Sequence, residues 1–151
     1  MITEDYVSFE TAKLLKEKGF VQPTRHYYSY DGRLGYAASE YNWNQTTGYY
    51  CDYSCISLPM AMKWLEEKHH ILVIPDYIYE CTDTSWRYKI YRLEQNGKPK
   101  RCEIKGVSYD KDNNPTEHIV GYRDYDESYE DYATREGACD AAIKYCLENL
   151  I

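Results

Sequence analysis

A patterned helix that runs directly into a nearly all-apolar stretch most constrains how this chain can fold. Residues 57–79 read SLPMAMKWLEEKHHILVIPDYIY. Positions at steps of three and four define one face of an α-helix, formed here by Leu58, Ala61, Met62, Leu65 and His69. Ser57 can cap this helix, and Pro59 lacks an amide hydrogen that would have no intrahelical partner there. We predict a helix that buries this stripe, with Trp64 half-buried beside it.

The residues that follow this helix predict an inner strand. Residues 71–74 (ILVI) leave no polar face, which is typical of a strand covered on both sides. Pro75 cannot donate to a β-ladder, so the strand must bulge, break or lie at a sheet edge there. We expect this helix and strand to organise the rest of the fold.

The N-terminal helix is marked at both of its ends. Ser8 is an N-cap candidate, and Gly19 suits the left-handed backbone that often ends a helix, so we predict a helix over residues 9–18. Phe20 would then pack back on Leu15, a contact that accompanies this kind of ending.

The C-terminal helix is predicted from its periodicity. Thr134 is its cap candidate, and the helix is expected from Arg135 to Asn149. Its buried stripe would comprise Cys139, Ala142, Ile143, Cys146 and Leu150.

A first hairpin is predicted near the N-terminus. Residues 25–30 (RHYYSY) read as a strand that enters an Asp31-Gly32 turn, with a partner strand at residues 34–38. Residues 39–55, rich in Asn, Thr, Gly and Tyr, have neither helical nor strand periodicity. We predict a long loop there, either functional or packed as a Tyr-rich flap over one end of the core.

The second half of the chain predicts a β-meander. Strands are expected at residues 85–94, 100–107 and 116–125, the first two joined through Asn96-Gly97 by a three-residue loop or a bulge. This register sets Ile90 opposite Ile104 and Glu94 opposite Lys100. The acidic residues 124–131 (DYDESYED) would form a solvated connection. The predicted fold is therefore α+β, a single domain with three helices and an antiparallel meander sheet of four to six strands.

Composition limits the function classes. The chain has 151 residues, a formal net charge of −7 and 19 Tyr among its aromatic residues. Such a charge argues against general binding to long nucleic acids, which requires a basic face. No apolar run is long enough to span a membrane and the first ten residues are acidic and polar, so we predict a cytoplasmic protein. The six cysteines include no C-x-x-C pair and are interpreted as small core residues.

No metal, cofactor or catalytic motif survives a check of its spacing. Residues 110–114 (DKDNN) begin like a calcium loop, but Pro115 stands where such a loop needs Gly, and Gly121 stands where it needs a bidentate Glu. An ordinary turn is favoured. His69 and His70 are adjacent and cannot share one metal as an i, i+4 pair would. We expect no cofactor and no metal.

Arginines interleaved with aromatic residues are the clearest candidate for ligand binding. Aromatic faces can stack on a base and guanidinium groups can bind a phosphate, which together suit a nucleotide-like ligand. The candidate residues are Arg25, Tyr27, Trp43, Tyr49, Tyr50, Trp86, Arg87, Tyr88 and Arg123. The alternative is that they form routine half-exposed sheet faces.

Three stretches resemble a group of short uncharacterised proteins encoded by phages and prophages of gut Bacteroidetes. They are YVSFETAKLLKEKGF (6–20), PMAMKWLEEKHHI (59–71) and AAIKYCLENLI (141–151). The resemblance covers the three helices, about 40 residues, and implies a phage accessory protein made in a bacterial cytoplasm. It assigns no functional residue.

Two hypotheses follow from these observations. The first is a non-enzymatic phage accessory protein that captures a nucleotide-derived small molecule as a counter-defence factor. The second is an inhibitor or structural factor that binds a host or phage protein through its Tyr-rich loop and acidic surface. Homo-oligomerisation is compatible with both. A small hydrolase is a third alternative, without visible catalytic residues.

Overall fold

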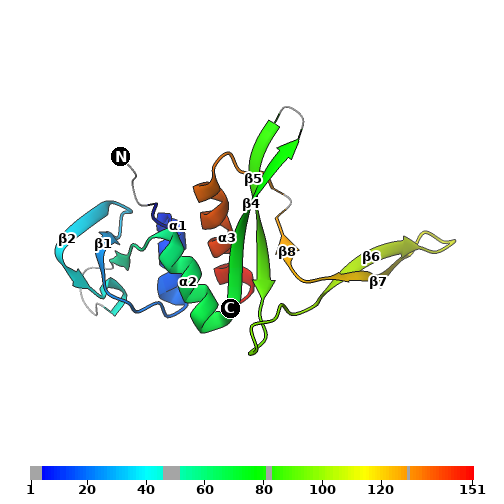
Figure 1. The fold of residues 1–151 in the computed structure, drawn as a ribbon, viewed down its shortest axis with the longest axis horizontal. Helices are drawn as coiled ribbons and strands as arrows, with labels where there is room; N and C mark the ends of the chain where they lie inside the picture. The colour runs from blue at the N-terminus through cyan, green and yellow to red at the C-terminus, as the bar shows by residue number, and fades with distance from the viewer. Residues whose placement is uncertain (1–4, 46–51, 81–82, 129) are drawn as a thin grey trace.

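Figure 1 shows the computed structural model, which describes residues 5–45, 52–80, 83–128 and 130–151. Its helices are α1 (Phe9–Glu17), α2 (Leu58–His69), α3 (Arg135–Asn149) and a short 3-10 helix η1 (Trp43–Gln45). Its strands are β1 (Thr24–Tyr28), β2 (Leu34–Tyr41), β3 (Tyr53–Ser54), β4 (Ile71–Glu80), β5 (Asp83–Arg92), β6 (Cys102–Tyr109), β7 (Pro115–Arg123) and β8 (Asp126–Glu127). All strand pairs are antiparallel, so the predicted α+β class is confirmed.

The predicted ends of α1 are confirmed. The Ser8 hydroxyl accepts the backbone N–H of Thr11, and Gly19 has a φ of 84°. The Phe20 N–H donates to the Leu15 carbonyl at 2.9 Å, and both side chains are fully buried. The α1 helix is therefore closed by hydrogen bonds that its own flanking residues supply.

The α2 helix buries Leu58, Ala61 and Leu65 as predicted, whereas Met62 and His69, also predicted to be buried, are half-buried. Ser57 is its N-cap residue but makes no side-chain capping bond, and His70 ends it with a φ of 55°. Trp64, predicted to be half-buried, is only 6% exposed. The reason is that the Phe20 ring lies 5.6 Å from the indole and the His69 ring 4.7 Å from it, measured between centroids.

The α3 helix has the predicted bounds and cap. The Thr134 hydroxyl accepts the Gly137 N–H at 3.0 Å. Its buried positions interlock with α1, α2 and the inner face of β4 and β5, where Ile71, Val73 and Ile90 are buried. These contacts form one continuous apolar core between the helices and this sheet.

The prediction of a strand covered on both sides is wrong. Ile71 and Val73 face the helices, whereas Leu72 is half-buried and Ile74 is 40% exposed. The helices contact one face of β4, so alternate residues of the apolar run point away from the core. Pro75 stays in the ladder opposite Tyr88, because β4 is the edge of the sheet β4-β5-β8.

The N-terminal strands form a separate sheet in the order β2-β1-β3. The predicted β1–β2 hairpin is confirmed, with Gly32 at a φ of 83°. The predicted loop over residues 39–55 is partly wrong, since β2 continues to Tyr41 and β3 begins at Tyr53. Asn44 connects this segment to the body, because its side chain donates to the Phe20 carbonyl and accepts the Ser54 N–H. Such bonds between a side chain and the backbone produce no periodicity in the sequence. Residues 46–51 lie outside the described residues.

The predicted continuous meander is also wrong, because β5 and β6 do not pair. The predicted three-residue loop is present at residues 95–97, since the Glu94 N–H donates to the Lys98 carbonyl and Leu93 pairs with Pro99, but the predicted pairing of Glu94 with Lys100 is wrong. Ile90 therefore lies opposite Val73 and Asp126, not opposite Ile104. The acidic segment, predicted to be a solvated connection, supplies β8 and occupies the second edge of β5. There Glu127 lies opposite Lys89 in the ladder, while the Glu127 carboxylate lies 3.8 Å from Arg123 and the Lys89 ammonium lies 3.0 Å from Asp76.

The strands β6 and β7 form a two-stranded ribbon that extends away from the helices and the other sheets (Figure 1). Its extensive contacts are between its own two strands. The turn at its far end matches the predicted turn at residues 110–115: the Asp110 carboxylate accepts the backbone N–H groups of Asp112 and Asn114. Among the described residues, no helix is both long and apolar enough to cross a membrane.

Candidate functional site

The nine predicted ligand-binding residues do not converge on one site. Arg25, Tyr27 and Trp43 belong to the N-terminal sheet and its 3-10 helix, whereas Trp86, Arg87 and Tyr88 lie on β5 and Arg123 ends β7. Tyr49 and Tyr50 lie outside the described residues. The predicted residues therefore have to be considered as two groups.

The group on β5 and β7 is already satisfied by internal contacts. Arg87 Nε lies 2.6 Å from the Asp131 carboxylate, and this hydrogen bond raises the pKa of Arg87 and lowers that of Asp131. The Trp86 ring packs against Tyr77, and Tyr88 is only 8% exposed. These positions match the alternative of a packed sheet face more closely than a phosphate site.

The N-terminal group lies beside a hollow. Tyr27 stacks on Trp43 with ring centroids 4.2 Å apart, which holds both rings against the sheet. Arg25, in contrast, is exposed and donates to the Tyr36 hydroxyl at 3.3 Å. The hollow next to Arg25 has a volume of about 320 Å³, and its lining includes the rings of Tyr6, His26 and Tyr36 together with the Glu40 carboxylate.

The cysteines behave as core residues. Cys55, Cys102, Cys139 and Cys146 are free and buried, as predicted, while Cys51 and Cys81 lie outside the described residues. Burial raises the pKa of the Cys55 thiol to about 11 and that of Cys146 to about 12. Neither thiol is therefore a nucleophile at neutral pH. No group of three metal-ligating side chains occurs in the described part of the chain.

The most unusual surface belongs to the β6–β7 ribbon (residues 102–109 and 115–123). It exposes large apolar side chains at fractions of 38% to 65%: Ile104, Val107, Tyr109, Ile119, Val120 and Tyr122. A two-stranded ribbon is at best marginally stable in water, and these side chains have no layer to pack on. These six side chains are distributed over both faces of the ribbon, which makes the ribbon a candidate interaction surface.

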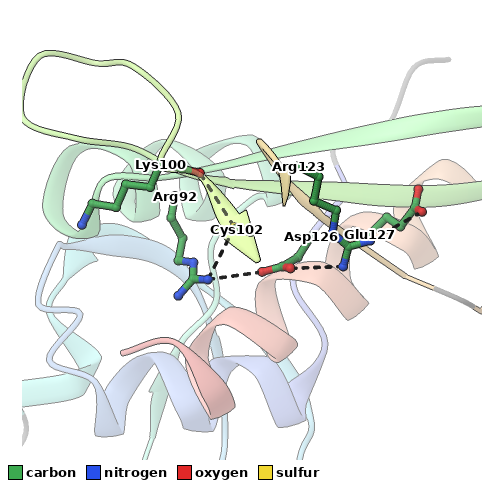
Figure 2. A network of polar contacts seen from close by, with 6 residues as sticks. All are labelled: Arg92, Lys100, Cys102, Arg123, Asp126 and Glu127. Atoms are coloured by element: carbon green, nitrogen blue, oxygen red, sulfur yellow. Dashed lines mark hydrogen bonds and ion pairs between the residues drawn. The ribbon is translucent and has the colours of Figure 1, made fainter. Parts of the chain in front are cut away.

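Figure 2 shows a network of polar contacts at the base of the ribbon. We call the network of Arg92, Cys102, Arg123, Asp126 and Glu127 the clasp. Asp126 on β8 lies 3.7 Å from an Arg92 nitrogen and 3.3 Å from an Arg123 nitrogen, and thus joins β5 to the end of β7. A second Arg123 nitrogen lies 3.8 Å from Glu127. Arg92 also donates to the Cys102 sulfur, a bond that raises the pKa of Arg92 and holds the start of β6. The clasp sets the direction in which the ribbon leaves the sheet.

A cavity of about 630 Å³ adjoins this clasp, between β5, β8 and α3. Its lining combines the rings of Tyr88, Tyr132 and Tyr145 with the side chains of Arg123, Asp126, Glu127, Glu130, Lys144 and Glu148. Carboxylates outnumber the basic groups, which disfavours a phosphate in this cavity.

Periodicity predicted both strands of the ribbon and the turn between them, but not that the two strands leave the sheet, although one signal was present. The adjacent apolar residues Ile119 and Val120 interrupt strict alternation, and the register skips Val120, so a bulge falls there. A strand that carries apolar residues on both faces, with no predicted layer to cover either face, would have indicated that this strand belongs to an exposed arm.

Comparison with known proteins finds no matching family model, no matching curated protein and no matching solved structure.

Proposed function

We propose that this chain is a non-enzymatic accessory protein that acts by binding another polypeptide, and that the β6–β7 ribbon is its contact element. The observation that carries the proposal is the run of exposed apolar side chains on this ribbon. Tyrosine is enriched in the buried centres of protein interfaces, and these centres are more apolar than the rest of a protein surface. The resemblance of the three helices to phage proteins supports a role as a phage accessory factor in a bacterial cytoplasm.

The contact surface differs from the one expected from sequence. The expected surfaces were the Tyr-rich loop, of which residues 46–51 lie outside the described residues, and the acidic segment. Within the acidic segment, Asp126 and Glu127 are engaged in the clasp. The clasp serves binding indirectly, because an arm held in one direction loses less conformational freedom on docking than a loose one.

Site-specific photo-crosslinking in the bacterial host tests this proposal. A benzophenone amino acid at Val107, on the ribbon, is expected to give a discrete crosslinked polypeptide. The same amino acid at Lys63, exposed on α2, serves as the control and should give none. Absence of any crosslinked polypeptide from Val107 and from Ile119, in variants shown to be folded, would overturn the proposal.

A second candidate function, capture of a small nucleotide-like ligand, is favoured at one place only. Among the described residues, Arg33, Arg87 and Arg123 form ion pairs, whereas Arg25 bonds a tyrosine hydroxyl at the edge of an aromatic hollow. A guanidinium beside rings of this kind suits a base and one phosphate, and the hollow's volume is at the lower end for ligand sites. Glu40 in the lining opposes additional negative charge.

Thermal-shift measurements separate this candidate from the first. Cyclic nucleotides and ADP-ribose derivatives should raise the Tm of the wild type, and Arg25→Ala should abolish the rise. Arg33→Ala is the matched control, because Arg33 lies in the same hairpin but is paired with Asp31 at 3.0 Å. If no compound in the panel shifts the Tm of folded protein, the small-ligand function is rejected.

A further inference from the structure

One face of the ribbon carries a continuous apolar stripe. Residues paired across an antiparallel ladder share a face, and the register pairs Glu103 with Tyr122, Lys105 with Ile119, Val107 with Glu117 and Tyr109 with Pro115. The bulge at Val120 brings Ile119 onto the same face as Tyr122. We call the surface of Val107, Tyr109, Ile119 and Tyr122 the stripe face. These four side chains are 47% to 65% exposed.

The opposite face is less suited to docking. Val120 lies over Gly106, since a Cβ at Gly106 would come within 2.6 Å of a Val120 methyl carbon. Ile104 lies near the clasp, and the outer part of this face carries Ser108 and Thr116, which pair in the ladder. Apolar area therefore reaches the tip of the ribbon on the stripe face alone.

The distribution of charge along the chain indicates which kind of partner the stripe face can bind. Residues 101–123 contain four basic and four acidic side chains, so the ribbon is formally neutral and the whole net charge of −7 belongs to the rest of the chain. Two copies that approached through their bodies would repel each other, whereas two neutral ribbons would not. Because the ribbon extends away from the body, contact at the ribbon also keeps the acidic parts apart (Figure 1).

The stripe face is also complementary to itself. Lys105 and Glu117 lie on it 3.3 Å apart, one of each sign. In a twofold dimer, Glu117 of each copy can pair with Lys105 of the other copy. A twofold interface requires this reciprocity, because every contact in it occurs twice. With typical side-chain areas, each stripe face exposes about 400 Å² of apolar surface. Two such faces supply about 800 Å² of apolar surface, and the Glu103, Lys105 and Glu117 side chains at their margins add to it, which suits a weak dimer that dissociates on dilution.

We infer that the stripe faces of two ribbons pack against each other about a twofold axis, so that the chain is a homodimer joined through its ribbons. This inference rests on the proposed function and names its partner as a second copy of this chain. The clasp at the base then fixes the angle between the two bodies.

Sedimentation velocity over a dilution series tests the inference directly. Wild-type protein should pass from dimer to monomer on dilution. Val107→Lys should weaken dimerisation by about tenfold or more, since it sets like charges across the axis. Val120→Lys is the matched control, because Val120 is 58% exposed but on the other face, and it should dimerise like the wild type. Circular dichroism and Tm establish that each variant is folded, and Tyr109→Ser provides a second, uncharged variant expected to weaken the dimer.

The possible results separate the inference from the proposed function. A monomeric wild type at all concentrations overturns the dimer, as does equal weakening by both lysine variants. If Val107 then crosslinks to a different polypeptide in the host, the proposed function stands with another partner. Failure of both self-association and crosslinking rejects both claims.

Discussion

The starts of α1 and α2 are held by different groups, a side chain in one helix and a backbone carbonyl in the other. Ser8 and Ser57 occupy the same N-cap position in α1 and α2, but only the Ser8 hydroxyl accepts a helical N–H. The difference arises because the start of α2 is held instead by the backbone bond from Leu58 N–H to the Asp5 carbonyl at 2.9 Å. Residue identity alone therefore could not tell these two caps apart.

This contrast predicts unequal costs for the same substitution. Ser8→Ala should lower the free energy of unfolding by about 1 kcal/mol, as expected for loss of an N-cap bond. Ser57→Ala should cost clearly less, because no capping bond is lost. Urea denaturation of both variants measures the difference, and a larger cost for Ser57→Ala would contradict the assignment of the caps.

The buried cysteines give a second prediction at this scale. Because burial raises the pKa of Cys55 to about 11 and of Cys146 to about 12, both thiols are protonated at pH 8 and lack the reactive thiolate. Iodoacetamide should therefore leave them unmodified in native protein and alkylate them in denaturant. Peptide mass mapping reads out each site. Native alkylation of Cys146 at the rate of a free thiol would show that the helix packing is wrong.

Elements differ in how far the sequence determined them. Ser8, Gly19 and Thr134 act within their own helices, so local pattern was enough to predict α1 and α3. The separation of β6 from β5 depends on residues far apart in sequence, because β8 takes the β5 edge and the Asp126 carboxylate there lies 3.7 Å from Arg92. Period-two alternation gives no information about such competition for an edge.

The same reasoning explains the candidate sites. Arg87 and Arg123 were predicted as ligand residues from their aromatic neighbours in sequence, but their carboxylate partners come from the acidic segment, whose position could not be foreseen. Arg25 and its aromatic hollow depend on a local hairpin, so that part of the candidate site was within reach of the sequence. The stripe face required the bulge at Val120, which only the register reveals.

The first hairpin offers a test of packing between elements. Gly35 lies opposite Tyr27, and a Cβ there would overlap the Tyr27 ring, at 2.7 Å from its Cε1 atom. Gly35→Ala should therefore displace Tyr27 from its stack on Trp43 and destabilise the protein by about 1–3 kcal/mol. Near-ultraviolet circular dichroism and thermal denaturation report these two effects.

Gly121→Ala is the control for this prediction. Its Cβ would meet only an Ile104 methyl carbon at 3.7 Å, an ordinary contact, so its stability should match that of the wild type. Equal behaviour of the two alanine variants would mean that Tyr27 does not occupy the position described.

At the scale of the whole molecule, stability and contact surface are separated in space. The helices and the inner face of β4 and β5 hold the apolar core, whereas the ribbon at one end of the molecule exposes its apolar residues (Figure 1). The clasp of Arg92, Arg123 and Asp126 connects these two parts. This separation is the arrangement that the proposed role of the ribbon in association requires.

Amide hydrogen exchange at several protein concentrations tests this central claim most directly. In dilute protein, amides of β6 and β7 should exchange much faster than those of β4 and β5, because the ribbon has two open edges and no packed layer. Raising the concentration should slow exchange in the ribbon selectively, and Val107→Lys should remove that effect. Ribbon amides as protected as the core at every concentration, or unprotected at every concentration, would contradict the account.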